Sequence, residues 1–306
     1  MKKFALSAIA AAALFGGAAH AYTVGTFSNG LVVPNVIHNG TDETTAIGLI
    51  NRTAQTIPVY WTFFNQNSGH EMDGCFAMTA NQYRPVTWQG LSTGRFANTR
   101  GYLVLAVGAT TAGGAPAASC DLVTPQLAGA TAQLAGNAFQ VRQAQRDVAV
   151  VPVIDGTLTV APATANIARM NADSLTNVAG ALTVAAPTQE ILARYAVDAG
   201  TTTRITVWST GSHKGTHTVD IYNDAQQRTS GNFALAEDEL SWFNPGAMES
   251  RPTGYTDGYI VWNPGVAAAT GGATSGALAS GGSVFVYSTI EATAFGAAQT
   301  LLGAHR

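Results

Sequence analysis

An internal repeat is the sequence feature that most limits how this chain can fold. Residues 44–51 (TTAIGLIN) match residues 202–209 (TTRITVWS) at an offset of 158, and residues 60–65 match 218–223 at the same offset. The offset becomes 157 further on, where Gly101-Tyr102-Leu103-Val104 meets Gly258-Tyr259-Ile260-Val261. A near-constant offset over about 65 residues predicts that one structural unit occurs twice.

Each half carries the period-two pattern of β-strands. Ile47 and Leu49 alternate with smaller residues in the first half, and Ile205 and Val207 do so in the second. Strands spaced about ten residues apart, with Gly- and Asn-rich turns between them, are typical of antiparallel sandwiches. We therefore predict an all-β fold of two tandem antiparallel sandwich domains.

The domain boundaries follow from the repeat. The first sandwich is expected over residues 22–155, a linker over 156–187 and the second sandwich over 188–306, with a short helix in the linker at 166–178. Each half also contains an insert rich in Ala, Gly, Ser and Thr, at 109–136 and 266–282, which is expected to form a mobile loop.

The halves resemble the immunoglobulin-like modules of secreted bacterial surface proteins. The resemblance rests on strand, turn, strand and then Gly-Tyr-x-Val, as in residues 101–104 and 258–261. It implies an immunoglobulin-like β-sandwich for each half. It carries no diagnostic motif, so it names no specific family and implies no site residue.

The N-terminus predicts export. Lys2 and Lys3 precede an apolar run, and small residues end in Ala19-His20-Ala21, so residues 1–21 have the pattern of a secretory signal peptide. No later stretch of the sequence is apolar for long enough to cross a bilayer as a helix. The mature protein is expected in the periplasm, at the cell surface or outside the cell, without a transmembrane segment.

Charge is sparse in the expected mature chain. Two of the 15 Lys and Arg residues lie in the leader, so 13 remain against 18 Asp and Glu. Nucleic acids and anionic membranes bind clustered Lys and Arg, which this chain lacks. The composition therefore argues against both as partners.

The two cysteines are expected to pair. Cys75 and Cys120 are the only cysteines, and lone pairs of cysteines in an oxidising compartment usually form a disulfide. Two free thiols are the alternative.

Candidate ligand sites come from aromatic and histidine residues. Trp88, Trp242 and Tyr255 lie near predicted loops and could form a stacking platform for sugars, whereas the other aromatics are expected in the core. His213 and His217 flank a predicted turn and could share copper or zinc, although a solvent-facing pair is the simpler interpretation. No cofactor is predicted.

Two further motifs are given structural interpretations. The segment from Gly90 to Gly94 (GLSTG) matches a nucleophile pattern that needs a strand-to-helix turn, which the all-β surroundings do not predict. The acidic run at residues 237–239 is expected to be a solvated loop rather than a calcium site.

These observations favour a non-enzymatic exported protein of the cell surface or extracellular matrix. It would act by binding or by self-assembly, since sandwich edges can pair with strands of another copy. A glycan-binding module and a periplasmic or surface copper-binding protein are the alternatives.

Overall fold

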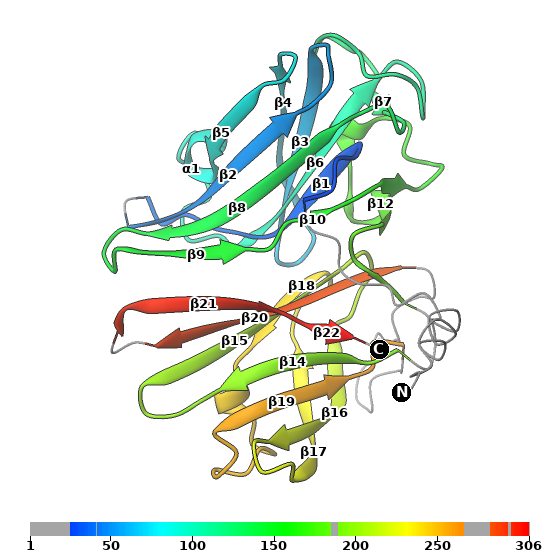
Figure 1. Ribbon diagram of the computed structural model, residues 1–306. Helices are drawn as coiled ribbons and strands as arrows, with labels where there is room; N and C mark the ends of the chain where they lie inside the picture. Colours follow the sequence, from blue (N-terminus) through cyan, green and yellow to red (C-terminus); the bar gives the residue numbers. More distant parts are fainter. Residues whose placement is uncertain (1–24, 41, 185–188, 266–281, 293–294, 306) are drawn as a thin grey trace, which may run out of the picture.

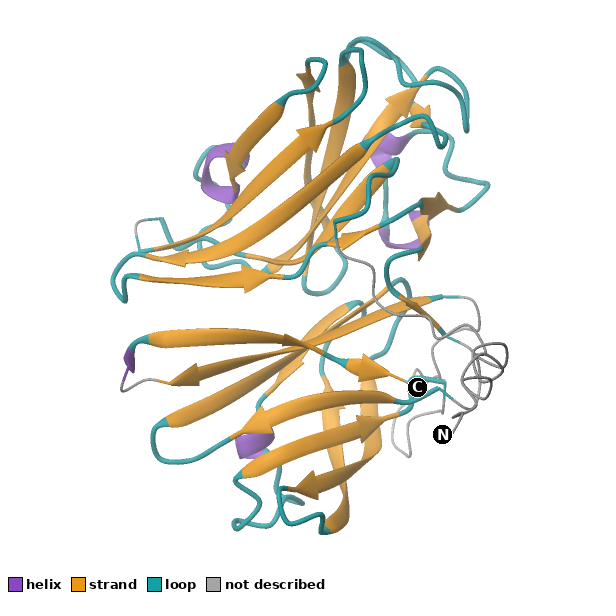
Figure 2. Ribbon diagram, viewed as in Figure 1, coloured by secondary structure: helices purple, strands orange, loops and turns teal. Residues whose placement is uncertain are grey.

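The computed structural model describes residues 25–40, 42–184, 189–265, 282–292 and 295–305. The fold is nearly all antiparallel β, as predicted, with short helical turns only (Figures 1 and 2). The predicted signal peptide and nearly all of the insert at 266–282 lie outside the described residues. No helix in the described ranges is long and apolar enough to span a membrane.

The first group of strands forms two sheets around one apolar core. Sheet 1a has the order β10-β1-β6-β3-β4, with β7 paired to β6, and sheet 1b has the order β5-β2-β8-β9. Ile47 and Leu49 of sheet 1b and Trp61 and Phe63 of sheet 1a meet in the core between them. The elements are β1 (Gly30–Val36), β2 (Glu43–Asn51), β3 (Ile57–Asn65), β4 (His70–Met78), β5 (Tyr83–Thr87), α1 (Trp88–Leu91), β6 (Gly101–Ala109), β7 (Gln126–Leu127), β8 (Leu134–Arg142), β9 (Asp147–Val151) and β10 (Ile154–Asp155).

The second group also forms two sheets around a core. Sheet 2a has the order β17-β16-β19-β14-β22; in sheet 2b, β18-β15-β20 is extended by β13 and β21, which both pair with β20. Ile205 and Val207 face Val219 and Ile221 across this core. The elements are β13 (Leu182–Thr183), β14 (Ile191–Ala196), β15 (Thr201–Ser209), β16 (Gly215–Asn223), β17 (Arg228–Leu235), β18 (Leu240–Phe243), η3 (Pro245–Ala247), β19 (Asp257–Trp262), β20 (Ser283–Ala292), β21 (Ala297–Leu302) and β22 (Ala304–His305).

The strands of the two groups have the same order within their sheets. The order β10-β1-β6-β3-β4 corresponds to β22-β14-β19-β16-β17, and β5-β2-β8-β9 corresponds to β18-β15-β20-β21. The order agrees with the immunoglobulin arrangement in placing the fifth strand beside the second and the sixth beside the third. It departs from that arrangement because β1 pairs with β6, while β8 takes the place beside β2.

The segment between the groups is structured. It contains β11 (Leu158–Val160), η1 (Ile167–Arg169), η2 (Ala172–Ser174) and β12 (Leu175–Val178), and β11 pairs with β12. The short helix predicted at 166–178 is therefore wrong. Asn166 and Asn171 cap single 3-10 turns with their side chains, which is a local alternative to a continuing helix.

Candidate binding surfaces

A third apolar core joins the two groups of strands. The outer face of sheet 1a contributes Phe64 and Tyr102, whose rings stack with centroids 5.0 Å apart. Sheet 2b contributes Trp208, which meets Tyr102 edge-on at 6.0 Å. Leu240, Phe285 and Tyr287 of sheet 2b and residues of the connecting segment complete the cluster. We call this contact between sheets 1a and 2b the junction.

A buried carboxyl lies in the junction. Glu239 is 5% exposed and accepts a hydrogen bond from the Tyr102 hydroxyl. Burial raises the pKa of Glu239 to about 7, although hydrogen bonds from Tyr102 and Ser68 oppose that rise. The acidic run was predicted to be a solvated loop, and Glu239 departs from that prediction because Tyr102 supplies a donor inside the junction.

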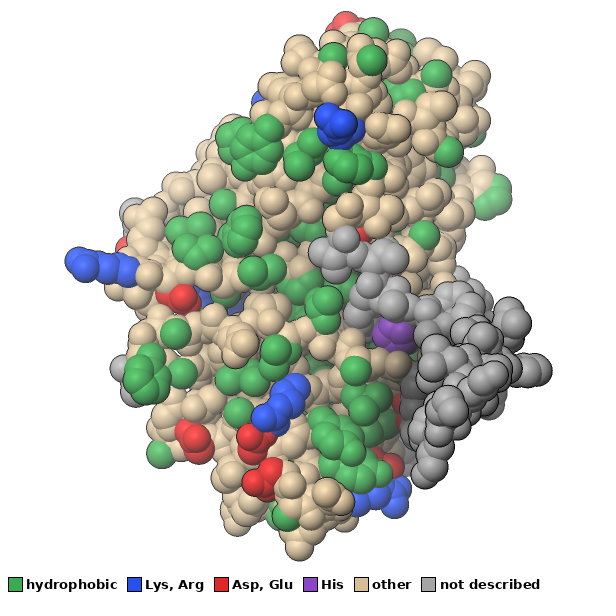
Figure 3. Space-filling view, viewed as in Figure 1, with side chains coloured by type: hydrophobic (Ala, Val, Ile, Leu, Met, Phe, Trp, Pro, Cys, Tyr) green, Lys and Arg blue, Asp and Glu red, His purple; other side chains and the backbone are tan. Residues whose placement is uncertain are grey.

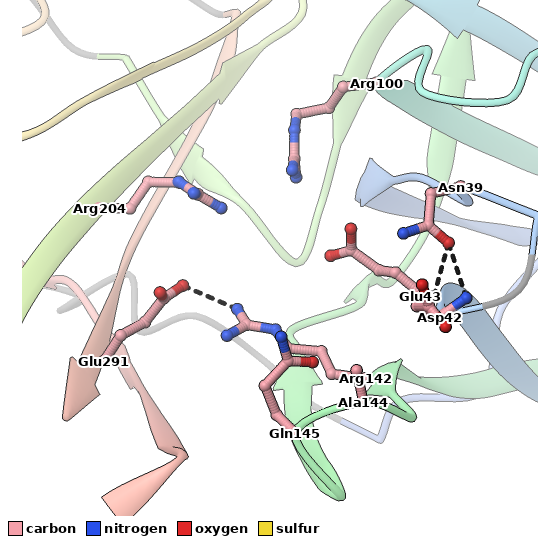
Figure 4. Close-up of a pocket in the computed structure, with 9 residues that line it drawn as sticks. All are labelled: Asn39, Asp42, Glu43, Arg100, Arg142, Ala144, Gln145, Arg204 and Glu291. Carbon is pink, nitrogen blue, oxygen red and sulfur yellow. Dashed lines mark hydrogen bonds and ion pairs between the residues drawn. The ribbon is translucent and has the colours of Figure 1, made fainter. Parts of the chain in front are cut away.

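A polar pocket of about 320 Å³ opens beside the junction (Figure 4). Arg142 of β8 and Glu291 of β20 form an ion pair of 2.7 Å across it. The side chain of Asn39 accepts hydrogen bonds from the backbone amides of Asp42 and Glu43, at 2.9 and 2.8 Å. The lining residues are Asn39, Asp42, Glu43, Arg100, Arg142, Ala144, Gln145, Arg204 and Glu291.

Arg100 and Arg204 point into this pocket from opposite groups of strands (Figure 4). Arg100 donates to the Asn35 amide oxygen at 2.5 Å and lies 5.2 Å over the Trp242 ring. Burial, and next the positive charge of Arg204, lower the pKa of Arg100 to about 10, so it stays cationic at neutral pH. Three arginines and three carboxylates balance the lining charge, and the described lining holds no Ser, Cys, His or Lys that could act as a nucleophile.

The three predicted sugar-stacking residues lie in three different cores. Trp88 is fully buried, 4.1 Å from the Phe63 ring, and has no open face for a ligand. Trp242 is half-buried in the junction beneath Arg100, and Tyr255 packs on the core of the second group. The structure therefore does not bring Trp88, Trp242 and Tyr255 together in one platform.

His213 and His217 are buried rather than solvent-facing. The Ser209 hydroxyl lies 2.9 Å from His213 Nδ1, and His217 Nε2 lies 2.7 Å from the His213 carbonyl oxygen. The other ring nitrogens, His213 Nε2 and His217 Nδ1, have no hydrogen-bond partner among the described residues. No group of three or more His, Cys, Asp or Glu in the described ranges could hold a metal ion, so the copper or zinc site stays a prediction.

The Gly90–Gly94 motif serves packing in this structure. Ser92 ends α1 and is fully buried, with its hydroxyl 3.2 Å from His38 Nε2. The same nitrogen lies 2.5 Å from the Arg95 carbonyl oxygen. A ring nitrogen that donates to a carbonyl carries a proton, so it cannot take one from Ser92. The contact between Ser92 and His38 ties this loop to the segment between β1 and β2.

The predicted disulfide is confirmed. Cys75 of β4 is bonded to Cys120, with the Cα atoms 5.9 Å apart. The Tyr60 hydroxyl donates to the Cys120 carbonyl at 3.1 Å. Together these contacts hold the first insert against sheet 1a.

The outer face of sheet 1b is uncharged and largely apolar. Tyr83 is 59% exposed, and Val148 and Val150 on β9 are 55% and 52% exposed. Figure 3 shows hydrophobic and uncharged polar side chains over the front of the upper sandwich, with few charged ones. Strand pairing places these residues on the same face: Tyr83, Pro85, Thr87, Thr44, Ala46, Gly48, Ile50, Ala135, Asn137, Phe139, Val141, Val148 and Val150.

Gly48 lets the Tyr83 side chain lie close to this face. A Cβ atom at Gly48 would come within 2.9 Å of Tyr83 Cε2. A larger residue at that position would push the ring away from the sheet. Gly48 therefore leaves room for the side chains of both Tyr83 and Asn137 on this face.

The outer face of sheet 2a carries a ladder of four side chains. Tyr222 and Tyr259 are directly opposite each other on β16 and β19, and their rings stack with centroids 4.8 Å apart. Arg228 is paired with Tyr222 on one side and Arg194 with Tyr259 on the other. Asp220 and Asp257 form ion pairs with Arg228 and Arg194, so both charges are balanced within the sheet.

Sequence reasoning missed these two outer faces. It assigned Tyr259 and most other aromatics to the core, because a strand pattern does not say which of two faces will be covered. The repeat held the missing signal: Phe64 and Tyr102 correspond to Tyr222 and Tyr259, but only the first pair is buried in the junction.

Comparisons with known proteins identify no relative. No family model matches the chain, and no curated protein matches it. Among solved structures, the DEL162-163 mutant of Bacillus subtilis oxalate decarboxylase OxdC is 6% identical, over 90% of this chain and 68% of that one, with a TM-score of 0.19. A second oxalate decarboxylase structure is 7% identical over 89% and 68%, with a TM-score of 0.17. Likenesses this low identify neither a fold nor a function.

Proposed function

We propose that this protein is exported and non-enzymatic, and that it acts at the cell surface or in the extracellular matrix by association through the outer face of sheet 1b. The observation that carries the proposal is the uncharged face that includes Tyr83, Val148 and Val150. Monomeric soluble proteins rarely expose contiguous apolar patches of more than a few hundred Å². The predicted leader and the disulfide support an extracytoplasmic location.

We infer further that the chain consists of two immunoglobulin-like sandwich domains that arose by duplication, with the first and last strands of each rearranged. Matching strand positions in the two groups support this inference. The near-constant offset of 157 to 158 residues supports it from the sequence. Duplication matters for function because it produces two copies of every sheet face.

The polar clusters of the described residues favour structural roles over catalysis. The Arg142–Glu291 pair and the Tyr102–Glu239 hydrogen bond both join the two groups of strands. The Ser92 hydroxyl is buried beside a histidine nitrogen that a carbonyl already occupies. A nucleophile with a free base and an open approach is the arrangement that acyl transfer would need.

The test is to place charge on the proposed face. We expect Tyr83→Glu combined with Val150→Glu to weaken self-association of the mature protein at least tenfold in sedimentation velocity, since each carboxylate would be desolvated on contact. Val123→Glu is the matched control, because Val123 is 94% exposed and lies outside this face. Unchanged association of the double variant would contradict the proposal.

Two further measurements test the alternatives. A glycan-binding module would bind a glycan array as a monomer. A copper-binding protein would retain stoichiometric copper when purified from its native source. If the protein binds glycan or copper, and the Tyr83→Glu, Val150→Glu variant binds that ligand as wild type does, the corresponding alternative is favoured over association through sheet 1b.

A further inference from the structure

We propose that the outer face of sheet 2a in one copy docks on the outer face of sheet 1b in the next copy, so that the chain assembles head to tail. This inference rests on the proposed function and names its partner as a second copy of this chain. Its basis is the junction. Within a single chain the junction joins sheets 1a and 2b, which correspond in strand order to sheets 2a and 1b.

The junction shows which faces fit together. It places the outer face of sheet 1a against sheet 2b, through Phe64 and Tyr102 on one side and Trp208 on the other. Sheet 2a corresponds to sheet 1a in strand order, and sheet 1b corresponds to sheet 2b. The two outer faces that no described sheet covers are therefore the counterparts of the two that are joined.

Corresponding positions keep much of the same chemistry. Tyr222 and Tyr259 stand where sheet 1a has Phe64 and Tyr102, and both pairs stack, at 4.8 and 5.0 Å. Ile50 and Tyr83 pair across β2 and β5 in the way that Trp208 and Leu240 pair across β15 and β18. An aromatic pair on one face and an apolar patch on the other are thus present twice.

The hydrogen-bonding position of the junction also has a counterpart. The Glu239 carbonyl accepts the Ser209 amide, and the Gln82 carbonyl accepts the Asn51 amide in the same way. Gln82 therefore occupies the position of Glu239, which binds the Tyr102 hydroxyl. In the contact between copies, Tyr259 would take the role of Tyr102 and Gln82 the role of Glu239.

The contact between copies is expected to be weaker than the junction. Sheet 1a presents Tyr60 and Thr62 where sheet 2a presents Thr218 and Asp220, so less apolar surface is available. In the junction the connecting segment adds further apolar residues, including Ile167 and Met170. We therefore expect association that is reversible and depends on protein concentration.

Symmetry distinguishes this arrangement from a simple dimer. A contact between two different faces leaves one of each free after every addition, so it generates open chains unless a ring closes. A contact of sheet 1b with itself would use the same patch on both copies and would stop at a dimer. The oligomer distribution therefore reports which faces meet.

The deciding experiment mixes two variants of the mature protein. Tyr222→Ser with Tyr259→Ser alters sheet 2a only, and Tyr83→Glu with Val150→Glu alters sheet 1b only. We expect wild type to form a concentration-dependent series of oligomers in sedimentation velocity, and each variant alone to be at least tenfold weaker. The mixture is expected to form a one-to-one heterodimer and nothing larger, since one intact pair of faces remains.

The outcomes separate this inference from the proposed function. Heterodimer formation also shows that both variants are folded, because each must present a working face. If the sheet 2a variant associates as wild type does while the sheet 1b variant does not, association through sheet 1b stands and the head-to-tail contact is overturned. If wild type is monomeric at all concentrations, or the sheet 1b variant associates normally, both are overturned.

Discussion

Glu239 shows how a single residue couples the junction to pH. Its pKa is raised to about 7 by burial, so the folded protein holds a proton that the unfolded chain releases near its ordinary value of 4.5. A raised carboxyl pKa gives stability that is fully present at low pH and is lost as pH rises through about 7. We expect Glu239→Gln to stabilise the junction by about 1 to 3 kcal/mol at about pH 8 and to have little effect at about pH 4. Urea unfolding at both pH values measures this.

Glu237→Gln is the control for that prediction, because it removes a carboxylate two residues away that bonds to the Gln66 amide. If Glu239→Gln and Glu237→Gln raise the free energy of unfolding equally at high pH, the cause is a general charge effect. In that case burial of Glu239 in the junction would not be the cause.

His213 predicts the opposite pH dependence. It is fully buried, and burial, then the neighbouring His217, lower its pKa to about 3. The unfolded chain binds the proton near pH 6.5, so the stability contributed by neutral His213 is present above that pH and is lost as pH falls toward 3. We expect His213→Asn to flatten this decline in acid unfolding followed by fluorescence. His70→Asn, on edge strand β4, is the control; a decline as steep in His213→Asn as in wild type would contradict the prediction.

At the scale of elements, the disulfide is the strongest link outside the cores. It closes a separation of 45 residues, so its loss is expected to cost about 4 kcal/mol in the chain-entropy model. We expect Cys75→Ser with Cys120→Ser to lower the denaturation midpoint of the first sandwich and to increase proteolysis within residues 110–125. The second sandwich, which has no cysteine, should melt as in wild type. Equal loss in both would show that the two groups unfold as one unit.

Prediction of the secondary-structure elements succeeded where apolar and smaller side chains alternate along a strand. It failed where hydrogen bonds from polar side chains determine the local backbone conformation. Strands β2 and β15 follow the period-two pattern of Ile47 with Leu49 and of Ile205 with Val207. The helix predicted at 166–178 failed because Asn166 and Asn171 each begin a separate 3-10 turn with side-chain hydrogen bonds, and the backbone is extended at Met170 between the two turns. The pairing of β1 with β6 was not predictable either, since alternation identifies a strand but not its neighbour.

At the scale of the whole molecule, the repeat predicted two similar halves but not how they meet. Tyr102 and Tyr259 have the same local sequence, Gly-Tyr followed by an apolar residue and Val, yet one is buried and the other is 36% exposed. The difference is produced by the partner face, Trp208 with Glu239, which lies more than 100 residues away in the chain. Long-range packing of this kind leaves no periodic signal, so the candidate surfaces could be found only in the folded protein.

The proposed assembly also predicts a response to salt. The strand-paired positions on the outer face of sheet 1b carry no charged side chain, and on sheet 2a Arg194 and Arg228 are paired with Asp257 and Asp220 of the same sheet. Because no charge pair has to form between copies, screening by sodium chloride should leave association nearly unchanged. Ammonium sulfate, which strengthens apolar burial, should shift the oligomers to larger size at equal protein concentration. Sedimentation velocity in both salts measures this, and dissociation in sodium chloride would mean that ion pairs between copies hold the assembly together.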